Sequence, residues 1–423
     1  MRSRGRRLPA VLAAVVAALA FAVPPAGASG PPGPGTGPWT GTWAAAMMRP
    51  SPGFGPNWSE EGFADHTLRQ VVRVSTGGAL ARVRLSNAYG TTPLRITGVT
   101  LARAADGAAV RPGTVRHLTF RGSRSVAVPP GGEVASDPAA FGVRPLDTLT
   151  VSLYFAEPTG PATQHLFASA TSYRAGGDHR SDAGSGAFTE TTESWYYLAG
   201  VDVAGAVPRR DAIAAFGDSI TDGALSTVDG NNRYPDELAE LLAARGKPRG
   251  VLNAGIGGNR VLTDSPCLGE KATSRFHEDV LDEPRVGTVL VLEGINDIGF
   301  SALPPGEDPC FSGGPEVTAE QLIAGHRELI RQAHRHGVKA IGLTLLPYKG
   351  ADYYTPEGEA VRDALNHWIR TSGEYDAVVD LDRIMAAPGD ADLLDPAYDS
   401  GDNLHPNDAG YHAMARAVVS ALR

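Results

Sequence analysis

A serine, an aspartate and a histidine stand in two short segments whose residue types can activate an alcohol for attack on an ester. Ser219 ends a Gly-Asp-Ser sequence that follows an apolar stretch, and Asp402 precedes His405 by three positions. A serine hydroxyl is a weak nucleophile until a nearby base removes its proton, and a carboxylate can orient that base. Each segment alone is weak evidence, since serine often caps a helix. Their joint occurrence predicts acyl transfer.

Two further groups that could stabilise a negatively charged oxygen follow other apolar stretches. Gly258 belongs to the glycine-rich segment 255–258, and Asn296 lies in the segment 294–297. Taken singly, such glycines are common turn formers, and such an asparagine commonly closes a local turn. Convergence of both donors with Ser219 at neighbouring strand ends favours an oxyanion hole. Arg260 could orient a polar or anionic substrate there, and a structural salt bridge explains this arginine equally well.

The C-terminal half, residues 211–423, alternates between strand and helix patterns and is predicted to form one α/β domain. Apolar runs predict strands at 212–216, 251–254, 288–293, 338–346 and 377–381. Amphipathic stretches with capping signals predict helices at 234–245, 318–336, 355–370 and 407–422. This alternation predicts a parallel five-stranded sheet with helices on both faces. Ligands of such sheets bind at the carboxyl ends of the strands, where the candidate residues fall.

The N-terminal half, residues 39–205, has a different pattern. Apolar residues alternate with polar ones at 81–86 and 148–155, and Gly/Pro-rich turns separate such stretches. Each stretch is predicted to be a strand with one buried and one solvent-exposed face. No helix pattern is evident in the sequence of this half. Many short strands with Gly/Pro turns predict an antiparallel β-sandwich or jelly-roll domain.

The first residues carry the pattern of a secretory signal peptide. Four arginines precede an apolar run that ends before the small-residue site 26–28, which predicts a signal peptide over 1–28 and a Gly/Pro-rich lead-in over 29–38. The pair Arg6-Arg7 is also compatible with twin-arginine export. Cleavage after Ala28 removes four arginines and no acid, which changes the formal charge from −9 to −13. We therefore expect a secreted, extracellular monomer without a membrane anchor, and no nucleic-acid partner.

The cysteines and acidic residues predict a disulfide and no metal site. Cys267 and Cys310 are the only cysteines, and two cysteines in an oxidising compartment predict one disulfide. They have no CxxC partner, which argues against zinc. The acids between 395 and 408 lack the spacing of a twelve-residue calcium loop. No cofactor is expected.

Taken in chain order, four blocks resemble those of the SGNH hydrolase (GDSL esterase/lipase) superfamily. They are Gly-Asp-Ser at 217–219, Gly258, Gly-Ile-Asn-Asp at 294–297 and Asp-Asn-Leu-His at 402–405. The resemblance covers about residues 212–422 and implies a flavodoxin-like sheet. The antiparallel half resembles, less specifically, the N-terminal sandwich domains of some secreted members, including carbohydrate deacetylases.

The same resemblance assigns a role to each candidate residue. It implies that Ser219 is the nucleophile, that His405 is the general base and acid, and that Asp402 orients His405. The oxyanion hole would consist of the backbone N–H groups of Ser219 and Gly258 and the side-chain amide of Asn296. The sequence does not depart from the superfamily pattern at these positions.

These observations predict a secreted serine esterase that forms an acyl-enzyme, with short acyl groups on carbohydrate as the favoured substrate. A lipase or lysophospholipase with the same triad, and acyl transfer to another alcohol, use the same residues. No long apolar lid segment is evident between Gly258 and Asn296, which favours short acyl chains. A carbohydrate-binding protein with an idle hydrolase domain is the alternative of another class. Its sugar-stacking aromatics would be Trp39, Trp43, Tyr89 and Trp195, although such residues are more often core.

Overall fold

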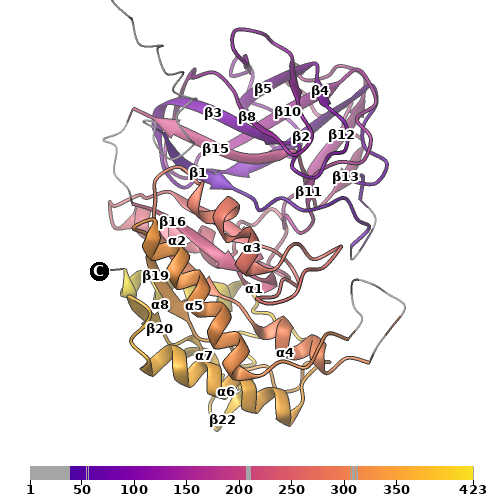
Figure 1. The fold of residues 1–423 in the computed structure, drawn as a ribbon. Coiled ribbons are helices and arrows are strands. Elements are labelled where there is room, and N and C mark those ends of the chain that lie inside the picture. The colour runs from indigo at the N-terminus through magenta and orange to yellow at the C-terminus, as the bar shows by residue number, and fades with distance from the viewer. Residues whose placement is uncertain are drawn as a thin grey trace, which may run out of the picture. The chain divides into compact units, whose positions relative to one another are not determined.

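The computed structural model describes residues 39–422, apart from positions 54, 56, 206–210, 305, 307–309 and 311–312. The predicted signal peptide and lead-in, residues 1–38, lie outside the described residues. The described chain contains antiparallel sheets in its N-terminal part and one parallel sheet in its C-terminal part (Figure 1). Each part has its own buried apolar core. The predicted fold class is therefore confirmed.

Two antiparallel sheets and two small strand pairs make up the N-terminal domain. One sheet contains β1 (Thr40–Ala44), β15 (Leu198–Ala204), β3 (Gly78–Ser86), β8 (Glu133–Ala135) and β9 (Ala139–Val143). The other runs in the order β13 (Glu190–Thr192), β12 (Ser172–Gly176), β2 (His66–Arg73), β10 (Thr148–Phe155), β5 (Gly98–Arg103) and β6 (Arg116–His117). The pairs are β11 (Gln164–His165) with β14 (Trp195–Tyr196) and β4 (Leu94–Ile96) with β7 (Val126–Val128).

The expectation that each strand has a solvent-exposed face is wrong for β10. This strand lies between β2 and β5, and Thr150 and Ser152 on its supposedly wet face are buried. The buried Arg69 of β2 donates to Ser152 Oγ over 3.1 Å and to the Asp182 carbonyl over 2.9 Å. Loops held by this arginine cover the outer face. A period-two pattern reports the polarity of side chains and cannot report coverage by distant loops.

The aromatic residues considered as sugar platforms belong to the interior. Trp39, Trp43 and Trp195 are buried, and the rings of Trp43 and Trp195 meet edge to face with centroids 4.8 Å apart. The guanidinium of Arg49 covers the half-buried ring of Tyr89. These rings therefore do not offer an open surface on which a sugar could stack.

The C-terminal domain is built on a five-stranded parallel sheet. Its order is β17 (Val251–Gly255), β16 (Ala212–Gly217), β18 (Val286–Leu292), β19 (Lys339–Leu343) and β20 (Ala377–Val379). One group of contacting helices contains α2 (Tyr234–Ala244), α7 (Leu381–Met385) and α8 (Asp408–Ala421). The other contains α3 (Ala272–Phe276), α4 (Ile295–Ser301), α5 (Ala319–Arg335) and α6 (Pro356–Thr371). Crossovers between parallel strands are right-handed as a rule, and with this strand order that rule puts the two groups on opposite faces of the sheet.

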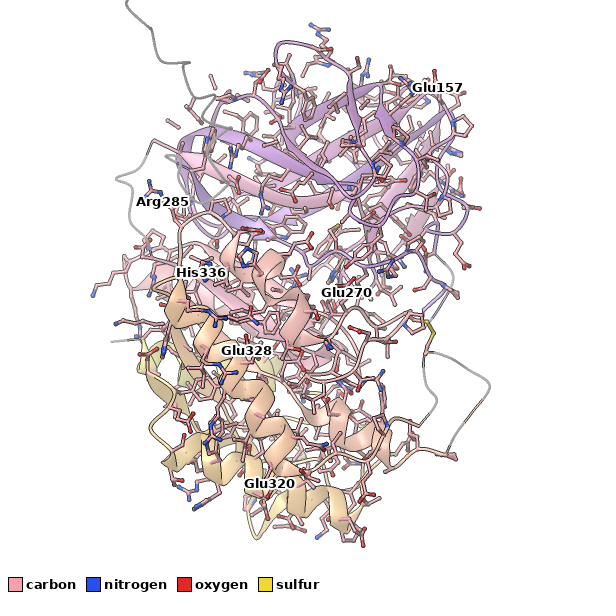
Figure 2. All side chains as sticks on the ribbon, viewed as in Figure 1. Glu157, Glu270, Arg285, Glu320, Glu328 and His336 are labelled. Atoms are coloured by element: carbon pink, nitrogen blue, oxygen red, sulfur yellow. A yellow bond between two sulfur atoms is a disulfide. The ribbon has the colours of Figure 1, made fainter. Side chains whose placement is uncertain are left out.

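The long helices begin where capping signals predict. Thr318 and Gln321 form a capping box at the start of α5. The helix can be found in Figure 2 by the labels of Glu320 and Glu328. Thr355 caps α6 ahead of Pro356. The short elements were not predicted: α1 (Ser219–Asp222), α3, the π-helix η1 (His277–Leu281), α4, α7 and the hairpin β21 (Ala386–Ala387) to β22 (Asp390–Leu394). They span few turns, so no periodicity can develop in the sequence.

The predicted disulfide is present. Cys267 and Cys310 are joined with their Cα atoms 5.4 Å apart, and the bond is drawn in yellow in Figure 2. It links the loop that follows β17 to the segment that follows α4. Among the described residues, no helix is long and apolar enough to cross a membrane.

A buried ion pair connects the two domains. Arg84 of β3 donates from Nη2 to both carboxylate oxygens of Glu283, over 2.7 and 2.6 Å, and from Nε to Asp202 over 3.3 Å. Glu283 lies between η1 and β18 and is buried. Burial alone would lower the pKa of Arg84, but Glu283 and Asp202 outweigh burial and raise it.

We expect Arg84→Met to lower the free energy of unfolding by about 3–5 kcal/mol, because it leaves a buried carboxylate without its cation. The matched control is Arg95→Met. Arg95 and Glu157 form a 3.7 Å pair whose side chains are 68% and 71% exposed, so the control should cost less than about 1 kcal/mol. Urea unfolding of both variants measures the difference. Equal losses would contradict a structural role for the buried pair.

Candidate active site

Ser219 stands at the junction between β16 and the one-turn helix α1. Asp218 caps this helix by accepting a hydrogen bond from the backbone N–H of Ile220 over 3.0 Å. Gly217 before it has no room for a side chain, since a Cβ would lie 2.4 Å from the carbonyl oxygen of Leu292 on the next strand. The turn therefore brings Ser219 out at the carboxyl end of the sheet.

Asp402 and His405 lie in the loop between β22 and α8, and the carboxylate organises its own turn. Asp402 Oδ1 accepts the backbone N–H groups of Leu404 and His405 over 3.0 and 2.8 Å. Asn403 between them adopts the left-handed conformation, with φ of 57°. Asp402 Oδ2 contacts His405 Nδ1 at 2.6 Å. This places the proton of a neutral imidazole on Nδ1 and leaves the lone pair of Nε2 pointing away from the carboxylate.

The lone pair of His405 faces the serine. Ser219 Oγ lies 2.8 Å from His405 Nε2, although 186 residues separate the two. Partial burial would raise the pKa of Asp402, but its hydrogen bonds with His405 outweigh this and lower it to about 2. The orienting carboxylate is therefore ionised at neutral pH. Serine, imidazole and carboxylate form one hydrogen-bonded line, the geometry in which a histidine can take a serine proton.

The expected oxyanion donors lie on the same pocket. Gly258 adopts a φ of +75°, which favours glycine, and Asn296 is the second residue of α4. Asn296 Nδ2 donates to the Asn259 carbonyl over 3.0 Å, and Tyr353 lies 3.4 Å from its Oδ1. These contacts fix the amide with its nitrogen toward the glycine turn. In the described part of the chain, the backbone N–H groups of Ser219 and Gly258 have no protein acceptor.

The guanidinium of Arg275 is buried beside the ends of β16, β17 and β18, which precede Ser219, Gly258 and Asn296. It donates to the carbonyls of Gly217 and Ala254, each over 2.8 Å, and to Asn259 Oδ1 over 2.8 Å. It also lies 3.4 Å from the buried carboxylate of Glu293. One side chain thus ties together the ends of β16, β17 and β18.

Burial raises the pKa of two carboxyl groups near the nucleophile. Burial raises the pKa of Asp218 to about 7, and burial together with Asp218 raises the pKa of Glu293. A raised pKa lessens the negative charge in a place where such charge would oppose a developing oxyanion.

An open pocket of about 1000 Å³ contains the candidate residues. Ser219, Gly258, Asn296, Asp402 and His405 all line it. Arg260 is not among the lining residues. Its guanidinium stacks on the ring of Phe300, 5.4 Å from the centroid, and donates to the Asp264 carbonyl over 3.3 Å.

Part of the lining comes from residues that the sequence did not point to. Phe167, Ser169 and Glu193 belong to the N-terminal domain, and Tyr353 follows β19. No local motif surrounds them. Only the three-dimensional packing of the domains brings them to the serine, so no signal in the sequence could have identified them.

The described ranges contain no group of three or more histidine, cysteine, aspartate and glutamate side chains that could hold a metal ion.

In the comparison with known proteins, the family match lies within the C-terminal domain. Residues 215–413 match the model of the GDSL-like lipase/acylhydrolase family. No curated protein matches the chain. Similar solved structures include a catalytic mutant of the acetylxylan esterase Axe2 from Geobacillus stearothermophilus, with 22% identity over 51% of this chain and 94% of that one and a TM-score of 0.38. Another is a GDSL-like lipase from Bacteroides thetaiotaomicron, with 18% identity, coverage of 52% and 90%, and a TM-score of 0.36.

The four blocks of the sequence, the parallel sheet and the family model thus agree. Residues 215–413 form a domain of the GDSL-like lipase/acylhydrolase family, and this domain is an ester hydrolase.

Proposed function

We propose that the protein is a serine esterase that works through an acyl-enzyme, with Ser219 as nucleophile, His405 as base and acid, and Asp402 as orienting carboxylate. The observation that carries the proposal is the unbroken line from Ser219 Oγ to His405 Nε2, at 2.8 Å, and from His405 Nδ1 to Asp402 Oδ2, at 2.6 Å. An isolated serine cap would not face an oriented imidazole.

In the first step, Ser219 Oγ attacks the ester carbonyl while its proton moves to His405 Nε2. The carbonyl oxygen gains a negative charge and is held by the N–H groups of Ser219 and Gly258 and the amide of Asn296. Collapse of this intermediate breaks the bond to the alcohol, which leaves with the proton from His405. Water then attacks the acyl-enzyme while its proton moves to His405 Nε2. The bond between the acyl carbon and Ser219 Oγ breaks, and His405 returns the proton to Ser219, which releases the acid.

We expect Ser219→Ala and His405→Ala each to lower kcat for p-nitrophenyl acetate by about 10³- to 10⁶-fold, and the double variant to be no slower than the worse single one. The reason is that nucleophile and base act as one unit. The exposed His334 pairs with Asp376 at the surface, so His334→Ala serves as the matched control and should keep its kcat. Covalent labelling by a fluorophosphonate should disappear in Ser219→Ala. Full turnover by that variant would refute the proposal.

The rate should depend on pH through the imidazole. Protonated imidazole cannot accept the Ser219 proton, so kcat/KM should fall as the pH is lowered. Because the pKa of Asp402 is lowered to about 2, its carboxylate stays charged near neutral pH and does not contribute to this fall in rate. Initial rates in buffers of constant ionic strength measure the profile. A flat profile would argue against a histidine base.

We propose short acyl groups on carbohydrate as the substrate class. The pocket is open and wide, and the hydrogen-bonding side chains of Glu193, Asp352 and Asn403 line it beside the catalytic groups. Such groups suit the hydroxyls of a sugar better than a hydrocarbon chain. Secretion would bring the enzyme to polysaccharide, and the disulfide is compatible with an oxidising compartment. An N-terminus at Ser29 in exported material would test the predicted processing.

A lipid ester is the second candidate, and one observation favours it. Leu225 and Val228 line the pocket and are 60% and 40% exposed. In the described part of the chain, Ile384 is the only other large apolar residue with comparable exposure. An apolar rim can contact the acyl chain of a lipid.

A series of p-nitrophenyl esters from acetate to octanoate, run beside acetylated xylan, separates these candidates. We expect kcat/KM to be highest for acetate and the xylan to release acetate. Leu225→Ser should then change the rates for acetate and octanoate by similar small factors, because the rim would not bind the acyl chain. A preference for octanoate that Leu225→Ser removes would support the lipid ester instead.

A further inference from the structure

A short segment of the N-terminal domain, residues 165–171, lies along the nucleophile helix and the loop after it. The Ser169 hydroxyl donates to the Gly223 carbonyl over 3.1 Å, and the Asp229 N–H donates to the Ser169 carbonyl over 3.0 Å. Arg233 donates to the Ala168 carbonyl over 2.7 Å. We call residues 165–171 the contact segment. These three contacts all involve residues between the end of α1 and the start of α2.

The contact segment begins with a buried histidine that has only acceptors around its ring. His165 Nδ1 lies 2.9 Å from the Ala46 carbonyl oxygen. Its Nε2 lies 2.9 Å from Asp222 Oδ1 and 3.0 Å from the Phe167 carbonyl oxygen. A neutral imidazole carries one N–H and would leave one nitrogen facing an acceptor without a proton, whereas the imidazolium satisfies both. Burial would lower the pKa of His165, but the Asp222 carboxylate outweighs burial and raises it.

Asp222 connects His165 to the glycine turn by hydrogen bonds. It is the last residue of α1, three positions after Ser219, and its Oδ2 accepts the backbone N–H of Gly257 over 3.0 Å. Gly257 immediately precedes Gly258, the expected oxyanion donor. Asp222 Oδ1 therefore contacts His165 of the N-terminal domain, and Oδ2 fixes the turn that directs the Gly258 N–H.

Apolar contacts hold the same turn against the N-terminal domain. Ile256 is buried in a small cluster whose other members, Ala46, Met48, Leu166 and Phe167, all come from that domain. Gly257 is close to the Phe167 ring, since a Cβ on Gly257 would lie 2.6 Å from Phe167 Cδ2. Ile256 and Gly257 both contact the N-terminal domain, so the glycine turn cannot shift without moving the contact segment.

We propose that His165 is a positioning residue for the oxyanion hole: through Asp222 it fixes the Gly257–Gly258 turn, so that the N-terminal domain completes the active site of the hydrolase domain. The inference rests on the proposed esterase function. It assigns the N-terminal domain a part in the chemical step, which is distinct from substrate binding and from stability alone.

Two substitutions of His165 separate its two hydrogen bonds. The amide nitrogen of asparagine takes the place of Nδ1, so His165→Asn keeps the bond to Ala46 and loses the one to Asp222. The amide nitrogen of glutamine takes the place of Nε2, so His165→Gln keeps the bond to Asp222. We expect His165→Asn to lower kcat for p-nitrophenyl acetate by about 10- to 100-fold with little change in KM, since small displacements of catalytic groups cost rates of this size.

His165→Gln should keep kcat within about threefold of the unsubstituted protein, since it restores the donor that matters. Rates are expressed per active site, counted by fluorophosphonate labelling carried to completion, so that misfolded protein does not contribute. Asn296→Ala, which removes an oxyanion donor, gives the reference loss of about 10²- to 10³-fold. Arg73→Gln removes a contact between the domains, the pair with Glu240, and should keep its kcat. Equal kcat values for the two His165 variants would overturn the inference.

A second pair of variants tests the same turn if His165→Asn does not fold. Gly257→Ala should lower kcat about tenfold in the otherwise unchanged chain, because its methyl group meets Phe167, and should have little further effect in Phe167→Ala. The same loss in both backgrounds would overturn the inference. Failure of the esterase proposal itself looks different, since Ser219→Ala would then be fully active whatever the other variants do.

Discussion

One buried guanidinium, that of Arg275, sets the distance between the groups that have to meet at the reacting ester. Buried carbonyl groups at the ends of strands need hydrogen-bond donors. Arg275 donates to the carbonyls of Gly217 and Ala254 and approaches Glu293, so it joins all three ends. The nucleophile and the expected oxyanion donors follow these ends within a few residues, and their spacing therefore depends on this contact.

The fold of the C-terminal domain could be predicted because its signals are local. The capping box of Thr318 and Gln321, the continuous apolar run of β18 and the proline at the start of α6 each lie within a few residues of the element they define. The exposed face predicted for β10 was wrong for the opposite reason. The cover over Ser152 comes from a loop held by Arg69, and no property of β10 itself reveals that loop.

The residues of the candidate site also divide into those that a local motif indicates and those that distant contacts bring together. Ser219, Asp402 and His405 could be proposed from sequence because each sits in a motif that a strand end or turn dictates, and the sheet then brings the motifs together. His165 could not, because Asp222, its partner, lies 57 positions away in another domain and neither residue belongs to a recognisable pattern. Arg260 shows the limit of proximity in sequence. It follows the glycine turn by two residues, yet its side chain packs on Phe300 beside the pocket.

Burying the ion pair between His165 and Asp222 has a cost in stability. Removing two charges from water is unfavourable by several kcal/mol for each ion, and a well-packed apolar pair would often be at least as stable. Charges nevertheless fix direction and distance in a way that apolar contacts do not, since Ile256 and Leu166 could slide past one another with little change in buried area. Next to Ser219, a displacement of about 1 Å can reduce the rate by about 10²-fold. An ion pair placed between the domain contact and the oxyanion turn is thus reasonable where geometry, more than stability, limits the reaction.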